Sequence, residues 1–104
     1  MNRVERKLPM TQEDLKNIIA GGEDSRTEFK SVSFHNEGMA KAVVAFANMQ
    51  GGRILVGVED DGRISGVDHP AEQVERLVSI CRNNIIPPLI PDIRYQGCDL
   101  YMIH

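Results

Sequence analysis

The clearest hydrophobic pattern in the chain is the continuous apolar run Ile54-Leu55-Val56-Gly57-Val58. Such a run predicts a strand that is covered on both faces of a sheet. The segment Thr27–Val32 differs, because apolar Phe29 lies between charged Glu28 and Lys30. This alternation predicts a strand with Phe29 on one face and the two charged residues on the other. Further strands are predicted at 92–95 and 100–103.

Apolar residues spaced three or four positions apart predict three helices. The first covers residues 11–20, and the second covers residues 37–48. The third begins at Pro70, a residue favoured in the first turn of a helix. Its predicted core-facing stripe consists of Val74, Leu77, Val78, Cys81 and Ile85. Cys81 is therefore interpreted as a small core residue rather than a nucleophile.

Two turn signals separate these elements. Gly51-Gly52 is suited to closing the second helix, because glycine adopts the left-handed conformation at little cost. Asp61-Gly62 is a two-residue hairpin signal, and it predicts a return strand over Arg63–Val67. The resulting order is α, β, α, β, β, α, β, β. It predicts an α+β (mixed α/β) fold, with a single central mixed sheet and helices packed on it.

The length of 104 residues predicts one domain. Residues 1–10 are expected to form a flexible lead-in, and residues 11–104 the domain. The chain ends at His104 within a predicted strand, so we expect an N-terminal fragment of a longer protein. No apolar run is long enough to cross a bilayer, and no secretory signal is recognisable. Two cysteines predict no disulfide framework, so a cytoplasmic location is expected.

The formal net charge of −3 argues against a binding mode that relies on strong phosphate attraction. The charge is unevenly distributed along the chain. Residues 1–58 carry eight Lys/Arg against seven Asp/Glu, whereas residues 59–104 carry four against eight. Any affinity for nucleic acid must therefore come from a local patch, from metal ions or from another segment.

Three carboxylates are the candidate functional groups of the chain. Glu23 and Glu28 flank the start of the first predicted strand, and Asp60 follows the apolar strand. If the two strands are neighbours, these side chains converge, and their repulsion favours Mg²⁺, Mn²⁺ or a nearby lysine such as Lys30. A metal held in this way activates water and neutralises a scissile phosphate. The alternative is that Glu28 and Lys30 are the solvated face of an edge strand.

Several short motifs occur together in a fixed order: Glu23–Lys30, Val44–Asn48, Gly51-Gly52 and Gly57–Gly62. With Gly66-Val67 and Ile86-Pro87-Pro88 added, the chain resembles the Schlafen/AlbA-2 domain family over nearly its whole length. The resemblance implies the N-terminal DNA-binding domain of a bacterial transcriptional regulator. Some related proteins are described as ATP-binding or helicase-related.

The resemblance also implies a nuclease site. Related domains in vertebrate Schlafen proteins cleave structured RNA with three carboxylates and a divalent metal. Matched motif to motif, the metal-binding and catalytic carboxylates fall on Glu23, Glu28 and Asp60. In this nuclease hypothesis Lys30, which shares a strand face with Glu28, is a further catalytic residue that stabilises phosphate charge. The vertebrate nucleases pair two such lobes into a basic clamp, whereas this chain is one lobe of net charge −3.

Three functions follow, in order of preference. The first is a nucleic-acid-binding regulatory module for DNA or structured RNA, and the second is a metal-dependent endoribonuclease. The third is a nucleotide-binding module that uses the Gly51-Gly52 turn and the acidic hairpin, with ATP held through Mg²⁺. A purely structural, protein-interaction role is the alternative to all three. ATP is not expected within this chain, because the turn lacks the lysine of a phosphate loop. No membrane partner is expected, and a homo-oligomer is compatible with the sequence.

Overall fold

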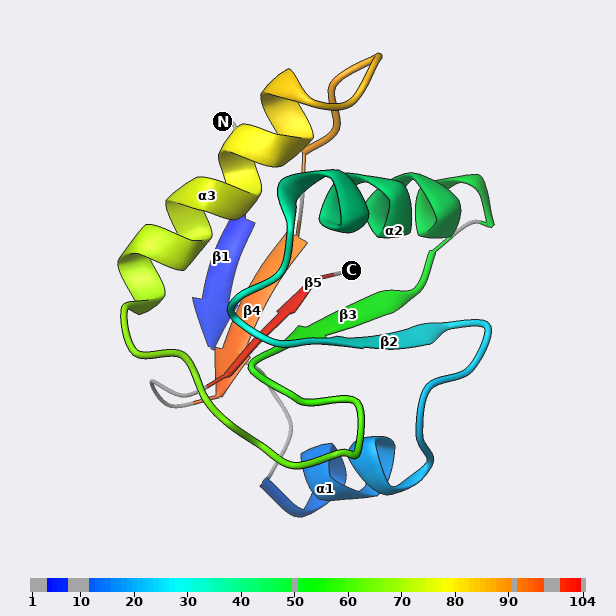
Figure 1. Ribbon diagram of the computed structural model, residues 1–104, viewed down its shortest axis with the longest axis vertical. Helices are drawn as coiled ribbons and strands as arrows, with labels where there is room; N and C mark the ends of the chain where they lie inside the picture. The colour runs from blue at the N-terminus through cyan, green and yellow to red at the C-terminus, as the bar shows by residue number, and fades with distance from the viewer. Residues whose placement is uncertain (1–3, 8–11, 50, 91, 97–99, 104) are drawn as a thin grey trace.

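Among the residues that the structure describes (4–7, 12–49, 51–90, 92–96 and 100–103), five strands form one mixed sheet. The structure is a computed structural model, shown in Figure 1. The strands are β1 (Val4–Lys7), β2 (Thr27–Lys30), β3 (Arg53–Val56), β4 (Asp92–Gln96) and β5 (Leu100–Ile103). Their order is β1-β4-β5-β3-β2. The outer pairs β1–β4 and β2–β3 are parallel, and β5 is antiparallel to both of its neighbours. The predicted α+β class with a central mixed sheet is confirmed.

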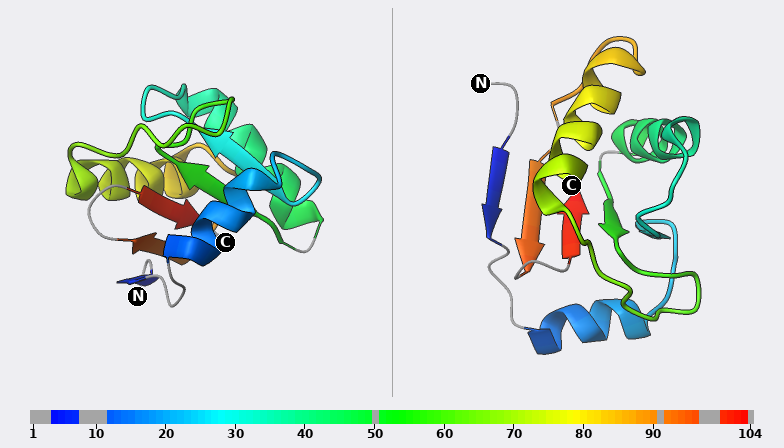
Figure 2. Two further views of the ribbon diagram at one scale, coloured as in Figure 1. Left: turned by 90° about the horizontal axis from the view of Figure 1, so that it is seen from below. Right: turned by 60° about the vertical axis from the view of Figure 1, so that its left-hand side comes forward.

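Helices cover the two faces of the sheet unequally (Figure 2). Helices α2 (Asn36–Asn48) and α3 (Pro70–Asn83) pack on one face, and the shorter α1 (Gln12–Ala20) packs on the other. All three agree with the predicted helices to within a few residues, and Pro70 lies in the first turn of α3 as expected. In the described part of the chain, no helix is both long and apolar enough to span a membrane.

Strand β3 divides the core into two clusters. Ile54 and Val56 face α2 and α3, whereas Leu55 faces α1 together with Phe29 of β2. Alternate residues of a strand point to opposite faces, so a strand buried on both sides needs an unbroken apolar run. Cys81 of α3 is also buried, and this burial raises the pKa of its thiol, in agreement with a core role.

Arg76 of α3 holds the loop that connects β2 to α2. Its Nε donates to Asn36 Oδ1 at 3.0 Å, and its Nη1 donates to the Val32 carbonyl at 3.4 Å. Its Nη2 donates to the carbonyl of Phe34, and the guanidinium lies 3.9 Å from the centroid of the Phe34 ring. One side chain thus satisfies two backbone carbonyls and fixes the start of α2 against α3.

Of the predicted lead-in the structure describes only residues 4–7, and residues 1–3 and 8–10 lie outside the described part of the chain. The sequence predicts a flexible lead-in over 1–10, but Val4–Lys7 form β1 and pair in parallel with β4. Strand pairing uses backbone groups, so a segment without an apolar pattern is able to join the edge of a sheet.

The return strand predicted over Arg63–Val67 is also wrong. A single isolated antiparallel bridge joins Val58 to Ile64, and no ladder extends from it within the described residues. Gly57 adopts a φ of 92°, and its carbonyl accepts the amides of Ser65 (2.9 Å) and Gly66 (3.0 Å). This arrangement folds the segment back onto the end of β3 and produces a tight loop instead of a hairpin strand.

Candidate functional site

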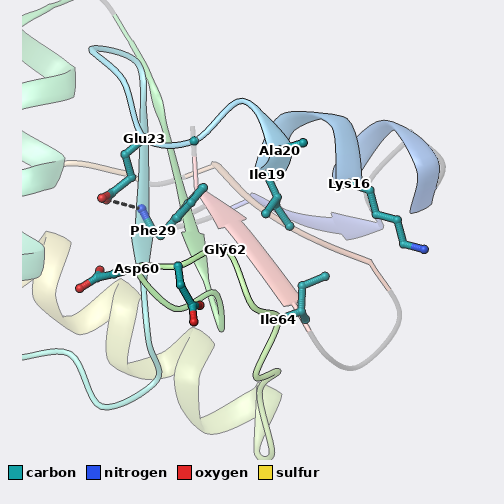
Figure 3. A pocket seen from close by; sticks show the side chains of 10 residues that line it. Lys16, Ile19, Ala20, Glu23, Phe29, Asp60, Gly62 and Ile64 are labelled. Carbon is teal, nitrogen blue, oxygen red and sulfur yellow. Dashed lines mark hydrogen bonds between the residues drawn. The ribbon is translucent and has the colours of Figure 1, made fainter.

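A pocket of about 420 Å³ lies between α1, β2 and the loop of residues 57–66, which we call the acidic loop (Figure 3). Its lining combines apolar, glycine and charged residues. The apolar members are Ile19, Ala20, Phe29 and Ile64, the glycines are Gly22 and Gly62, and the charged members are Lys16, Glu23, Asp60 and Asp61. Convergence of a few charged groups on an apolar hollow is typical of ligand sites.

Two turns bring the polar residues to this pocket. Gly22, with a φ of 76°, turns the chain after α1 and leads into Glu23. Gly62, with a φ of 87°, closes the acidic loop through a bond from its amide to the Glu59 carbonyl at 2.9 Å. An ideal Cβ at Gly62 would lie 3.4 Å from Ile19 Cγ2, so the acidic loop approaches α1 closely at this point.

Glu23 is fixed at the outer edge of the sheet. Its Oε2 accepts the backbone amide of Phe29 at 2.9 Å. Because β2 is an edge strand, this amide has no neighbouring strand to accept it. A bond from a backbone amide to a carboxylate is stronger than one between neutral groups, so Glu23 both caps the edge and holds its own position.

Asp60 lies on the acidic loop after β3, exposed to solvent. Within the described residues its carboxylate has no hydrogen-bond or ion-pair partner. Its two neighbours differ, because Glu59 accepts the Ser65 hydroxyl at 2.5 Å and Asp61 accepts the Arg63 amide at 2.9 Å. In Figure 3 the carboxylates of Glu23 and Asp60 point toward the same side of the pocket.

Glu28 and Lys30 occupy the other face of β2. They pair with Ile54 and Val56 in register, so they share the α2 side of the sheet, whereas Phe29 faces the pocket. Lys30 Nζ lies 3.1 Å from Glu28 Oε2, and both side chains are half-buried. The positive charge of Lys30 is therefore balanced by the carboxylate of Glu28 on the same strand.

The predicted site is thus partly assembled. The predicted adjacency of β2 and β3 is confirmed, and Glu23 and Asp60 line one pocket. Glu28 is not among the described residues of its lining. In the described part of the chain, no group of three His, Cys, Asp or Glu side chains is placed to hold a metal ion. The three-carboxylate metal site and the catalytic role of Lys30 stay predictions.

The Gly51-Gly52 turn closes α2 and is unsuited to phosphate. The Gly51 amide donates to the Phe46 carbonyl at 2.7 Å, and the Phe46 ring fills the space where a Cβ of Gly52 would lie. This turn follows the carbonyl end of a helix, whereas phosphate is favoured at the amide end.

Lys16 and Ile64 are pocket residues that the sequence did not single out. Lys16 lies on the polar side of a short amphipathic helix, where lysine is ordinary. Ile64 was assigned to a return strand. Neither position carries a local signal, because the pocket exists only once α1 and the acidic loop are brought together.

A comparison with protein-family models matches residues 23–101 to the family described as Schlafen, AlbA_2. The matched range begins at Glu23 and contains Glu28, Lys30 and Asp60, whereas α1 with Lys16 precedes it. No curated protein and no solved structure matches the chain.

Proposed function

Because the chain belongs to the Schlafen AlbA_2 family, we propose that it is a nucleic-acid-binding module, the DNA-binding domain of a transcriptional regulator. The family match, which associates the chain with nucleic-acid-related function, carries this proposal. The match spans more than half of the chain and contains six of the ten described residues that line the pocket, among them Glu23, Phe29 and Asp60.

The charges of the site limit how nucleic acid is bound. Among the described residues that line the pocket, three are carboxylates (Glu23, Asp60 and Asp61) and one is a lysine, Lys16. The carboxylates of this lining repel phosphates unless a cation lies between carboxylate and phosphate. Phosphates are therefore contacted by Lys16 and by basic side chains outside the pocket. The net charge of −3 likewise predicts few phosphate contacts and a shallow dependence on salt.

Fluorescence anisotropy with labelled DNA and RNA tests the proposal. We expect binding at about 50 mM salt, and a plot of log affinity against log salt with a slope of roughly −2, as for about two phosphate contacts. Lys16→Gln is expected to weaken binding. Lys41→Gln, which removes an exposed charge on α2 outside this pocket, serves as the charge-matched control. Absence of binding at low salt would contradict the proposal.

A second candidate is metal-dependent cleavage of structured RNA, favoured by the presence of Glu23 and Asp60 in one pocket. Mg²⁺ is commonly bound by one or two carboxylates, several waters and the phosphates of the substrate. Glu23 and Asp60 fit that pattern and would hold the ion, which would neutralise phosphate charge. Glu28, turned to the other face, would not contact it without a rearrangement of β2.

Incubation of structured RNA with the protein and Mn²⁺ tests this second function. Cleavage by the wild type that disappears in Asp60→Asn would support it. Comparison with Glu28→Ala then distinguishes the two-carboxylate arrangement from the three-carboxylate one. Intact RNA in every sample would rule out the nuclease and leave the binding proposal in place.

A further inference from the structure

We infer that the pocket between α1 and the acidic loop binds a guanine nucleotide of a single-stranded nucleic acid. The inference rests on the proposed nucleic-acid-binding function, and it names the unit that is recognised. Its basis is the order of the groups labelled in Figure 3: Glu23 and Asp60 at one end of the pocket, apolar residues in the middle and Lys16 at the other end.

The carboxylate end selects for hydrogen-bond donors. Asp60 has no partner among the described residues, and Glu23 uses Oε2 for the Phe29 amide, which leaves Oε1. An ionised carboxylate only accepts hydrogen bonds. The ligand must therefore present N–H or O–H donors at this end, and a phosphate or a carbonyl edge would be repelled.

Guanine is the base that matches this requirement best. Its Watson–Crick edge carries the N1–H and N2–H₂ donors side by side, which allows two parallel bonds to one carboxylate. Adenine and cytosine present one amino group next to an acceptor nitrogen. Uracil and thymine present one N–H between two carbonyl oxygens, which face the carboxylates unfavourably.

The apolar middle suits the face of a base. Phe29 is 4% exposed and forms a closed floor, whereas Ile64 of the acidic loop is 44% exposed and available for contact. Ile19 of α1 is half-buried on the pocket wall. Extruded bases are commonly held between apolar or aromatic side chains, which contribute stacking without reading sequence.

The opposite end and the size of the pocket agree with a nucleotide. Lys16 extends at the end of the pocket away from Glu23 and Asp60, and no described residue pairs with it. It is placed to meet the phosphate of a nucleotide whose base edge faces Glu23 and Asp60. The volume of about 420 Å³ lies within the range of small-molecule sites, about 300–1,000 Å³, and exceeds what a lone ion needs.

Binding of four short single-stranded RNAs that differ at one central base, measured by anisotropy in EDTA, tests the inference. We expect the guanine strand to bind at least about tenfold more tightly than the uracil strand, as a bidentate base contact provides. Asp60→Asn is expected to reduce this preference to within about twofold. Glu37→Gln, an exposed carboxylate on α2, is the charge-matched control and should keep the full preference.

The outcomes of this experiment distinguish failure of the guanine inference from failure of the nucleic-acid-binding proposal. Equal affinity for the four strands would overturn the guanine inference and leave the nucleic-acid-binding proposal standing. A preference that disappears in EDTA, or that survives Asp60→Asn, would also overturn the inference. Absence of binding to any strand would contradict both proposals. Urea unfolding of each variant confirms that an altered preference does not come from an altered fold.

Discussion

At the scale of single residues, Gly57 determines where Asp60 lies. It follows β3 directly and adopts a φ of 92°, in the region that favours glycine. A Cβ at this position would lie 2.9 Å from the Gly66 carbonyl oxygen and 3.1 Å from Val67 Cγ2. The close return of the acidic loop, and with it the carboxylate end of the pocket, therefore depends on the absence of a side chain.

We expect Gly57→Ala to lower the free energy of unfolding by more than the conformational cost alone, which is about 1–2 kcal/mol for a left-handed residue. The overlap with Gly66 adds to this cost, because a backbone carbonyl cannot move aside freely. Gly22→Ala is the matched control, since Gly22 has a φ of 76° and no atom of the described residues lies within 4 Å of an ideal Cβ. Equal losses for the two variants in urea unfolding would contradict this account.

At the scale of elements, the alternation of β2 explains which part of the site was predictable. The pattern of charged Glu28 and Lys30 around apolar Phe29 correctly predicted opposite faces. The same alternation separates Glu28 from the pocket that Phe29 lines. Glu23 reaches that pocket because it precedes the strand and folds back to the Phe29 amide, a contact that no periodicity reveals.

Arg76 connects α3 to the start of α2, so its removal should destabilise the packing of these two helices. We expect Arg76→Met to lower the free energy of unfolding by about 2–4 kcal/mol, because charged hydrogen bonds to partly buried carbonyls are lost. Arg82→Met, at an exposed position in the last turn of α3, should change it by no more than about 0.5 kcal/mol. Chemical unfolding of both variants makes the comparison, and similar values would refute the anchoring role.

At the scale of the whole molecule, local patterns predicted the three helices and strands β2 to β5, but they missed β1 and wrongly predicted a return strand over residues 63–67. The buried run of β3 and the stripe of α3 follow from apolar periodicity. β1 did not, because it contains three charged residues among four and is held by pairing with β4, far away in the chain. Likewise, the pocket arises from contact between α1 and the acidic loop, which are far apart in the sequence because β2 and β3 lie between them in chain order.

The central claim is that nucleic acid is bound at the pocket between α1 and the acidic loop. Backbone amide shifts of the ¹⁵N-labelled chain, followed during titration with a guanine-containing single strand, test it most directly. We predict that the largest changes cluster at residues 16–23 and 59–64, with little change along α2. Changes concentrated on the outer surfaces of α2 and α3, with the pocket residues unaffected, would contradict the account.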